Sequence, residues 1–372
     1  MPKHSRYLRP QILRDLKQKM VFVAGPRQVG KTTLAKSLPN GSKGYLNWDI
    51  TADRQRILAG ELPPGPLWIF DEIHKYRSWR NFLKGLYDGR KPGQRILVTG
   101  SARLDYYRFS GDSLQGRYHL LRLHPLSAAE LALAGREELA TFLALGGFPE
   151  PFFSGSLRRA QRWSREYQSL LVREEVASLE QVRDLGNLEL LMMRLPDLVG
   201  SPLSINSLRE DLQLDHKTVA NWLSVLERLY ALFRISPFGP PLVRATKKAQ
   251  KYYLFDWSRV ASNGARFENL VACHLLKWVH FQQDTEGREL ELRYFQTPDG
   301  REVDFVVTER TRPILLVECK WSDGPVGRGL LYLQERFKEA ESWQISAIGT
   351  KDFATPEGIR VAPALALLGK LV

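Results

Sequence analysis

The sequence contains little cysteine, and this scarcity excludes several classes of protein. Its two cysteines, Cys273 and Cys319, do not make a disulfide framework, and no Cys/His cluster has the spacing of a zinc site. No apolar run reaches the ~18–20 residues of a membrane-spanning helix. The first residues lack the long apolar segment of a secretory signal. We therefore expect a reducing, cytoplasmic setting and no membrane contact.

Length and composition favour a globular protein of several domains. The 372 residues exceed what one core ordinarily holds, so we expect two or three domains. Hydrophobic residues make up 43% and charged residues 26%, a balance that argues against long disordered regions. The net charge of +13 favours a polyanionic partner, and nucleic acid first. Between the two nucleic acids, we expect DNA before RNA. A basic background that serves only solubility would give the same excess.

Short apolar runs alternate with helical segments in the first third of the chain, which predicts a parallel α/β sheet. Strands are expected at residues 20–24, 45–48, 67–70 and 95–99. We assign this domain to residues 1–125. Residues 126–200 are expected to form a helical segment or lid, with a long amphipathic stretch from Leu157 to Val182.

Residues 201–255 show a different pattern, typical of a winged helix. Two helices, near 204–212 and 216–230, precede strands at 233–235 and 252–255. Four residues would stand near the start of a recognition helix: His216, Lys217, Thr218 and Asn221. Four others would form a basic wing for phosphates: Arg244, Lys247, Lys248 and Lys251. The alternative is a module that only packs two catalytic domains together.

A second basic face is suggested within the helical segment. Arginines recur there at helical spacing, namely Arg158, Arg159, Arg162 and Arg165. Such runs are more often solvated surface than binding sites.

A phosphate-binding loop follows the first expected strand. The segment from Gly25 to Thr32 fits G-x-x-x-x-G-K-[ST], with a strand before it and a helix after it. The two glycines permit a close approach of the backbone, and N–H groups at the start of the helix favour an anion. Lys31 would reach the β- and γ-phosphates, and Thr32 would bind Mg²⁺. The expected nucleotide contacts are Gly25, Pro26, Arg27, Gln28, Val29, Gly30, Lys31, Thr32 and Thr33.

Two carboxylates complete this site about 40 residues later. The apolar strand Leu67–Phe70 ends in Asp71 and Glu72. Asp71 would hold Mg²⁺, and Glu72 would polarise the attacking water. Each motif alone also fits a glycine-rich turn or an acidic strand end. Their order and spacing together favour a nucleoside triphosphatase.

Three further residues are candidates for sensing the γ-phosphate. Thr99 ends the strand expected at 95–99 and Ser101 comes two residues later, although a plain strand-to-loop turn would look the same. Arg117 would sense phosphate in its own chain or act as a finger on a neighbouring subunit. A surface or nucleic-acid-facing role for this arginine is equally consistent with the sequence.

The chain resembles a prokaryotic AAA+ family of ATPases that carry a C-terminal domain of formerly unknown function. The matching segments are GPRQVGKTT (25–33), WIFDEIHKYRSW (68–79), ILVTGSA (96–102), QGRYHLLRLHPLSAAEL (115–131), GGFPEP (146–151), RFENLVACHLL (266–276), GREVDFVV and LLVECKW. The resemblance implies an AAA+ core that can form a homo-oligomer, a winged-helix middle and a nuclease-like end. It also implies ATP in preference to GTP.

The C-terminal part, residues 256–372, returns to an α/β pattern and carries an ordered acidic set. Glu268 lies on an expected helix, Asp304 on one strand, and Glu318 with Lys320 at the end of the next. This order resembles the restriction-endonuclease-like PD-(D/E)XK core. Its carboxylates would hold Mg²⁺, and Lys320 would orient the attacking water. An E-x-K pair alone is usually a solvated strand edge, and Val303 stands where the motif has proline.

These features predict an α/β multi-domain, Mg-dependent ATPase that associates with DNA. Nucleotide binding would gate a metal-dependent nuclease-like domain. The alternative is a nucleotide switch or scaffold that does not cut, whose C-terminal domain only binds DNA or mediates assembly.

Overall fold

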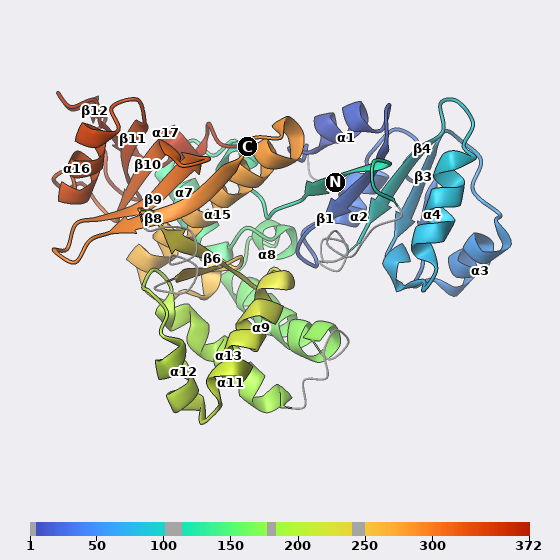
Figure 1. Cartoon of the computed structure of the whole chain (residues 1–372), viewed down its shortest axis with the longest axis horizontal. Helices are drawn as coiled ribbons and strands as arrows, with labels where there is room; N and C mark the ends of the chain where they lie inside the picture. Colours follow the sequence, from blue (N-terminus) through green and yellow to red (C-terminus); the bar gives the residue numbers. More distant parts are fainter. Residues whose placement is uncertain (1–4, 101–113, 177–183, 240–249) are drawn as a thin grey trace. The chain divides into compact units, whose positions relative to one another are not determined.

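The computed structural model describes residues 5–100, 114–176, 184–239 and 250–372. The chain divides into two compact units, residues 1–126 and 127–372 (Figure 1). Among the described residues, no helix is long and apolar enough to cross a membrane. The predicted α/β architecture is confirmed, since one unit contains a parallel sheet and the other a mixed sheet.

The first unit is built on a five-stranded parallel sheet. Its strands are β1 (Met20–Ala24), β2 (Tyr45–Asn47), β3 (Leu67–Asp71), β4 (Arg95–Thr99) and β5 (Tyr118–Arg122). They lie in the order β2-β3-β4-β1-β5. β1 is buried throughout, as expected for an interior parallel strand covered on both faces. The order sets β4 between the strand before the phosphate loop and the strand that ends in Asp71.

Short helices connect these strands and complete the core. They are α1 (Arg9–Asp15), α2 (Lys31–Lys36), α3 (Thr51–Ala59), the 3-10 helix η1 (Ile73–Lys75) and α4 (Trp79–Asp88). Trp79 and Leu83 of α4 pack with Phe22, Phe70 and Val98 of the sheet. This packing fixes the carboxyl ends of β1, β3 and β4 side by side, where polar side chains follow the apolar strands.

The second unit begins with helices. They are α6 (Ala128–Leu131), α7 (Arg136–Leu145), α8 (Pro149–Phe153), α9 (Leu157–Leu170), α11 (Leu185–Arg194), the 3-10 helix η4 (Leu195–Leu198), α12 (Ile205–Leu212) and α13 (His216–Arg228). The amphipathic stretch expected from Leu157 to Val182 is not one regular helix. It changes to a π-helix over Leu171–Val176, and residues 177–183 lie outside the described part.

An eight-stranded mixed sheet follows in the same unit. Its strands are β6 (Leu232–Pro237), β7 (Lys251–Leu254), β8 (Leu290–Gln296), β9 (Glu302–Glu309), β10 (Arg312–Lys320), β11 (Glu341–Ser346), β12 (Phe353–Ala354) and β13 (Arg360–Pro363). The order is β12-β13-β11-β10-β9-β8-β6-β7. The sequence predicts neither β8, β12 nor β13. The 3-10 helix η5 (Trp257–Arg259) and the helices α15 (Asn263–Glu286), α16 (Arg328–Arg336) and α17 (Leu365–Leu368) complete the unit.

The β6–β7 hairpin expected in the winged helix forms, but it belongs to this sheet. β6 pairs antiparallel with β7 and parallel with β8. The hairpin therefore extends the C-terminal sheet and brings β7 close to the acidic residues of that domain. A winged helix that acts as a separate module stays a prediction.

Helix α15 anchors the start of the second unit. The buried Lys277 ammonium pairs with Glu130 of α6, and His274 Nε2 accepts a hydrogen bond from the Ala128 N–H at 3.0 Å. Burial lowers the pKa of His274 to about 4, so this imidazole is neutral at physiological pH and able to accept that bond.

Candidate phosphate site and acidic centre

The phosphate loop takes a shape that requires glycine at two positions. Gly25 has a φ of 143°, and a Cβ there would lie 2.2 Å from the Leu123 carbonyl oxygen. Gly30 has a φ of 98° and stands in the left-handed region just before α2. Side chains at these positions would strain the loop or move it.

Lys31 spans this loop from the start of α2. Its Nζ donates hydrogen bonds to the carbonyl oxygens of Gly25, at 2.9 Å, and Pro26, at 2.6 Å. The side chain is buried. The ammonium is therefore held within the loop, where arriving phosphate oxygens would replace the two carbonyls. Of the other predicted contacts, Val29 is buried, whereas Gln28 and Thr33 are exposed.

Asp71 is the centre of a hydroxyl network. Thr32 Oγ1 donates to its Oδ2 at 2.7 Å, and Thr99 Oγ1 donates to its Oδ1 at 2.7 Å. Both residues were singled out by the sequence, and the structure brings them to one carboxylate. A hydroxyl beside a carboxylate is a hard oxygen pair of the kind that Mg²⁺ prefers, so the residues present fit this ion.

Tyr45 is the member of this network that the sequence did not reveal. Its hydroxyl donates to Asp71 Oδ2 at 2.7 Å and accepts from Asn47 Nδ2 at 3.3 Å. Burial and then the neighbouring Asp71 carboxylate raise the pKa of Tyr45 well above its usual value. No local motif marks Tyr45, because its partner comes from the adjacent strand β3.

Glu72 lies directly beyond Asp71 in a strained conformation. Its φ is 57°, and its N–H donates to the Thr99 carbonyl oxygen at 2.9 Å. The carboxylate lies 3.5 Å from both His74 Nε2 and Lys75 Nζ. Burial raises the pKa of Glu72, and the charges of Lys75 and Lys31 oppose this rise. Left-handed backbone at a non-glycine residue is typical of functional sites.

The structure does not bring Arg117 to the phosphate loop. Arg117 directly precedes β5, at the amino edge of the sheet, and its carbonyl accepts from the Met20 N–H at 3.0 Å. Its guanidinium pairs with Asp88 at 2.9 and 3.1 Å. Five strand residues, roughly 16 Å, separate this edge from the loop. Of the roles expected for Arg117, phosphate sensing within its own chain is therefore wrong. Ser101 lies outside the described residues.

The acidic set of the C-terminal domain comes together from three elements. α15 supplies Glu268, β9 supplies Asp304, and β10 supplies Glu318 with Lys320. Asp304 Oδ2 accepts from the Cys319 N–H at 2.7 Å, and Lys320 Nζ donates to Glu318 Oε1 at 2.7 Å. Burial, before any neighbouring charge, raises the pKa of each of the three carboxylates.

A buried lysine enters this acidic centre from β7. Lys251 Nζ lies 2.5 Å from Glu302 Oε1 and 3.9 Å from Glu268 Oε1, and its side chain is 1% exposed. Tyr253, also on β7, donates to Glu268 at 2.7 Å. The expectation that Lys251 belongs to a basic wing is therefore wrong, because β7 packs into the C-terminal sheet. Arg244, Lys247 and Lys248 lie outside the described residues.

The sequence thus missed Lys251, Tyr253 and Glu302 of this centre. Of these three, only Glu302 could have been found from the sequence, because it lies two residues before Asp304 on a strand and shares its face. Within the described parts of the chain, no three Asp, Glu, His or Cys side chains are arranged to hold a metal ion. Tyr253 and Lys320 each donate to one oxygen, of Glu268 and Glu318 respectively, and the Cys319 N–H donates to Asp304. A metal set of Glu268, Asp304 and Glu318 stays a prediction. One buried oxygen, Glu318 Oε2, has no hydrogen-bond partner among the described residues.

The candidate recognition helix, α13, begins with the cap residue Asp215. This cap binds Thr218, one of the residues predicted to contact nucleic acid. Asp215 accepts from the Thr218 N–H at 3.0 Å and from its hydroxyl at 2.5 Å. His216, Lys217 and Asn221 are exposed. On α9, Arg158 and Arg159 are exposed and Arg162 pairs with Glu166 at 2.8 Å. The acid at the start of α13 weakens this end as a site for a phosphate backbone.

The positive charge is not shared between the two units. Residues 1–126 contain 23 Lys and Arg against 9 Asp and Glu, a net charge of +14. Residues 127–372 contain 31 against 32, a net charge of −1. The basic excess read from the whole sequence therefore belongs to the phosphate-loop unit.

Comparisons with known proteins agree with this division of the chain. An AAA domain family model matches residues 17–132. Two domains of unknown function, DUF8612 and DUF4143, match residues 136–262 and 263–367. Uncharacterized proteins from Mycobacterium bovis and Mycobacterium tuberculosis are each 24% identical over 244 residues. That match covers 64% of this chain and 54% of theirs, so the chain spans about half the length of the curated relatives it matches.

Solved structures show weaker similarity. A Thermotoga maritima RuvB variant is 17% identical, with a TM-score of 0.28, over 61% of this chain and 88% of that one. The Aeropyrum pernix ORC1 protein in complex with DNA is 16% identical, with a TM-score of 0.32, over 71% and 89%. TM-scores this low do not establish a shared fold. The AAA domain model thus covers the residues of the phosphate loop and of the strands β1 to β5, and the models of two domains of unknown function cover the residues that follow.

Proposed function

We propose that this chain binds and hydrolyses ATP with Mg²⁺ at the phosphate loop and associates with DNA. One observation carries the ATPase proposal. Thr32 and Thr99, from separate elements, both donate to the buried Asp71 beside a loop with the P-loop sequence. A structural role alone would not require a P-loop lysine, a hydroxyl and two carboxylates at one edge of the sheet.

The residues divide the work of phosphoryl transfer among them. Backbone N–H groups of the loop and the Lys31 ammonium bind the phosphates, in place of the Gly25 and Pro26 carbonyls. Thr32 and Asp71 would hold Mg²⁺, which would neutralise charge at the phosphate oxygens. Glu72 in its ionised form orients a water molecule and accepts its proton. Thr99 keeps the Asp71 carboxylate in place.

Steady-state ATP turnover tests this proposal. Lys31→Ala removes the phosphate-binding ammonium and Glu72→Gln removes the base, so both variants are expected to lose turnover by about 100-fold or more. Lys43→Ala, an exposed lysine of the same unit, is the matched control. Fluorescent ATP analogue titrations should show that Glu72→Gln still binds nucleotide. Full turnover in Lys31→Ala or Glu72→Gln contradicts the assignment, and equal competition by GTP contradicts the choice of ATP.

As a second function, we propose that residues 256–372 cut nucleic acid in a metal-dependent reaction gated by nucleotide. The buried Glu318 Oε2, which has no described partner, supports this proposal, because such an oxygen suits an incoming cation. Lys320, bonded to Glu318, is placed to orient water. The position of Lys251 favours the alternative, a domain that binds or assembles without cutting, because its charge already serves the acidic centre.

Cleavage assays separate these two roles. Plasmid and single-stranded DNA are incubated with Mg²⁺ or Mn²⁺, with and without ATP. Cleavage that disappears in Asp304→Ala and Lys320→Ala, and persists in the exposed control Glu335→Ala, supports a nuclease. An ATP-dependent difference supports gating. No cleavage with either metal and either substrate supports the scaffold.

We also propose that the AAA domain forms a homo-oligomer in which Arg117 acts on a neighbouring subunit. Its place at the amino edge, far from its own phosphate loop, supports an action in trans. Mixing inactive Lys31→Ala and Arg117→Ala subunits tests this, because mixed oligomers then contain intact sites. No recovered turnover in the mixture contradicts the proposal.

A further inference from the structure

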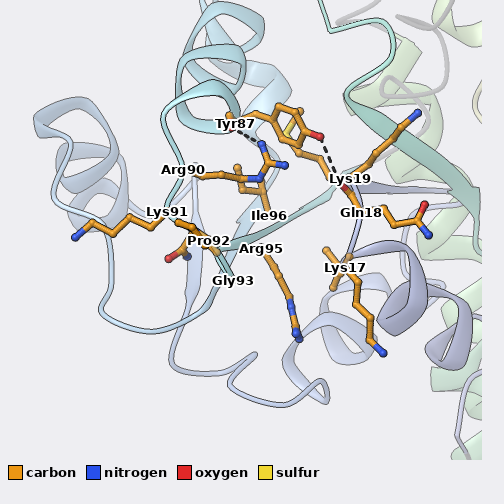
Figure 2. A pocket seen from close by; sticks show the side chains of 13 residues that line it. Lys17, Gln18, Lys19, Tyr87, Arg90, Lys91, Pro92, Gly93, Arg95 and Ile96 are labelled. Carbon is orange, nitrogen blue, oxygen red and sulfur yellow. Dashed lines mark hydrogen bonds between the residues drawn. The ribbon is translucent and has the colours of Figure 1, made fainter.

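A pocket of about 380 Å³ lies at the amino edge of the parallel sheet, on the side opposite the phosphate loop (Figure 2). It lies between the segment that joins α1 to β1 and the segment that joins α4 to β4. Met20 and Arg95, the first residues of β1 and β4, form part of its wall. The function proposed above does not use this pocket.

The pocket is lined by five cationic side chains, Lys17, Lys19, Arg90, Lys91 and Arg95. None of the lining residues that the structure describes is acidic. Among the described residues, none of these five cations forms an ion pair, whereas the nearby Arg117 is paired with Asp88. Five like charges in one pocket repel each other, and an anion would relieve that repulsion.

One cation of the pocket is held in a fixed orientation. The Arg90 guanidinium lies 3.5 Å from the centre of the Tyr87 ring, and its Nη1 donates to the Tyr87 carbonyl oxygen at 2.5 Å. The Tyr87 hydroxyl donates to the Gln18 carbonyl oxygen at 3.3 Å on the opposite side of the pocket. Little side-chain entropy remains to be lost when Arg90 contacts a ligand.

The spread of the cations indicates the form of the anion. Figure 2 shows Lys17 and Lys91 extending toward different sides of the pocket, with Arg90 between them. Lys17 and Lys91 are exposed. A single small phosphate is usually held by donors that converge on one point. Charges spread along a rim instead suit successive phosphates of a chain.

We propose that this pocket binds the sugar-phosphate backbone of a nucleic acid. The inference rests on the proposed association with DNA and locates it on the phosphate-loop unit, which carries the net charge of +14. Contacts to phosphates carry no sequence information, so the binding is independent of sequence. Because the pocket and the phosphate loop lie at opposite edges of one sheet, nucleic acid and ATP can bind together.

Binding of a fluorescein-labelled 30-base-pair DNA duplex to the full chain, without nucleotide, tests the proposal by anisotropy across a salt series. The pocket variant is Lys17→Gln with Lys91→Gln. The control is Lys338→Gln with Lys351→Gln, two exposed lysines in the other unit whose loss changes the net charge equally. The pocket variant should lose at least about 10-fold in affinity, and its salt slope should fall by about 2, one for each lost phosphate contact. The control should bind as the wild type does.

Three results overturn the proposal: wild-type affinity in the pocket variant, equal losses in both variants, or wild-type binding to phosphatidylserine vesicles but not to DNA. ATP turnover is measured in the same preparations. If the pocket variant keeps both its ATP turnover and its DNA binding, only the pocket proposal is contradicted. If the wild type does not hydrolyse ATP, only the ATPase proposal is contradicted. Arg90→Lys, which keeps the charge but loses the planar group over Tyr87, should lose affinity by a smaller factor.

Discussion

Carboxylates buried at strand ends occur in both units of this chain, and their partners differ. In the first unit, Asp71 receives three hydroxyl groups, each at 2.7 Å, from Thr32, Tyr45 and Thr99. In the second unit, the acidic centre contains two ammonium groups, those of Lys251 and Lys320. Its carboxylates are those of Glu268, Glu302, Asp304 and Glu318. Asp71 is thus stabilised by neutral hydroxyl donors, whereas the carboxylates of the acidic centre are stabilised by the opposite charge of two lysines.

This difference predicts how each centre responds to a divalent cation. Hydroxyl donors leave the negative charge of Asp71 in place, and a threonine hydroxyl can itself become a metal ligand. An ammonium group cannot bind a metal, and its charge repels one. The first centre is therefore ready for Mg²⁺, whereas the second must first displace or outcompete lysine.

Removing either the Thr32 hydroxyl or the Asp71 charge from the first centre should have the largest effect. Thr32→Val keeps the shape but loses the hydroxyl, and Asp71→Asn loses the charge. ATP turnover should fall by about 1,000-fold in each, because neither variant keeps both Mg²⁺ ligands. Turnover against Mg²⁺ concentration gives the measurement.

Thr32→Ser supplies the matched control, since it retains a hydroxyl at the same position. It should keep turnover within about 10-fold of the wild type. Should Thr32→Val hydrolyse ATP as fast as Thr32→Ser, the hydroxyl has no metal role and the contrast between the centres disappears.

Removing the buried ammonium of the second centre should destabilise the fold. Lys251→Met leaves Glu268 and Glu302 without their shared counter-charge, at a cost of about 3 kcal/mol in the free energy of unfolding. Glu302 is 39% exposed, which keeps this figure at the low end. Mg²⁺ that binds the vacated carboxylates should raise the Tm of this variant more than that of the wild type.

Lys320→Met is the control for that experiment, because Lys320 is 37% exposed and water screens its charge. Its loss of stability should be below about 1 kcal/mol. Thermal unfolding by circular dichroism measures both variants. Equal losses in the two, or no Mg²⁺ effect in Lys251→Met, would show that Lys251 does not take the place of a cation.

The first centre could largely be predicted from the sequence, and the second only in part. Residues 25–32 are contiguous, and their chemistry dictates the loop, so the motif carries its own geometry. Asp71 and Thr99 follow apolar strands whose carboxyl ends meet at one edge. Tyr45 was missed because it precedes its partner by 26 residues, on a strand of three residues.

Lys251 was misassigned for a related reason. A lysine beside a basic loop and two tyrosines indicates a surface strand, and only the pairing of β6 with β8 moves β7 into the C-terminal sheet. Parallel pairing between distant strands leaves no local signal in one sequence. The charge division, by contrast, follows from the sequence once a domain boundary near residue 125 is assigned, although the total of +13 alone does not show it.

Tyrosine hydroxyls allow a direct comparison of the two centres. Tyr45 and Tyr253 each donate to a carboxylate at 2.7 Å. Tyr253→Phe should cost about 2 kcal/mol in unfolding free energy, because this tyrosine is fully buried and Glu268 loses a donor. Tyr45→Phe should cost about 1 kcal/mol, because Asp71 keeps two hydroxyls. Chemical denaturation measures both, and a larger cost for Tyr45 would reverse the comparison.

The smallest expected effect concerns the ionisation of Glu72. Its carboxylate must be charged to accept a proton, and burial raises its pKa. ATP turnover should therefore fall as pH falls through that raised pKa, above the usual range of a glutamate. Lys75, 3.5 Å away, is the strongest influence that lowers this pKa. Lys75→Met should move the acid limb of the pH profile to higher pH.

That movement should be below about one pH unit, because the Lys75 side chain is 38% exposed and solvent screens its charge. The pH dependence of kcat at saturating ATP measures it. Lys43→Met, which removes an exposed lysine outside the site, should leave the limb in place. A shift to lower pH in Lys75→Met has the wrong sign for a base that must be ionised. It would assign the acid limb to a group other than Glu72.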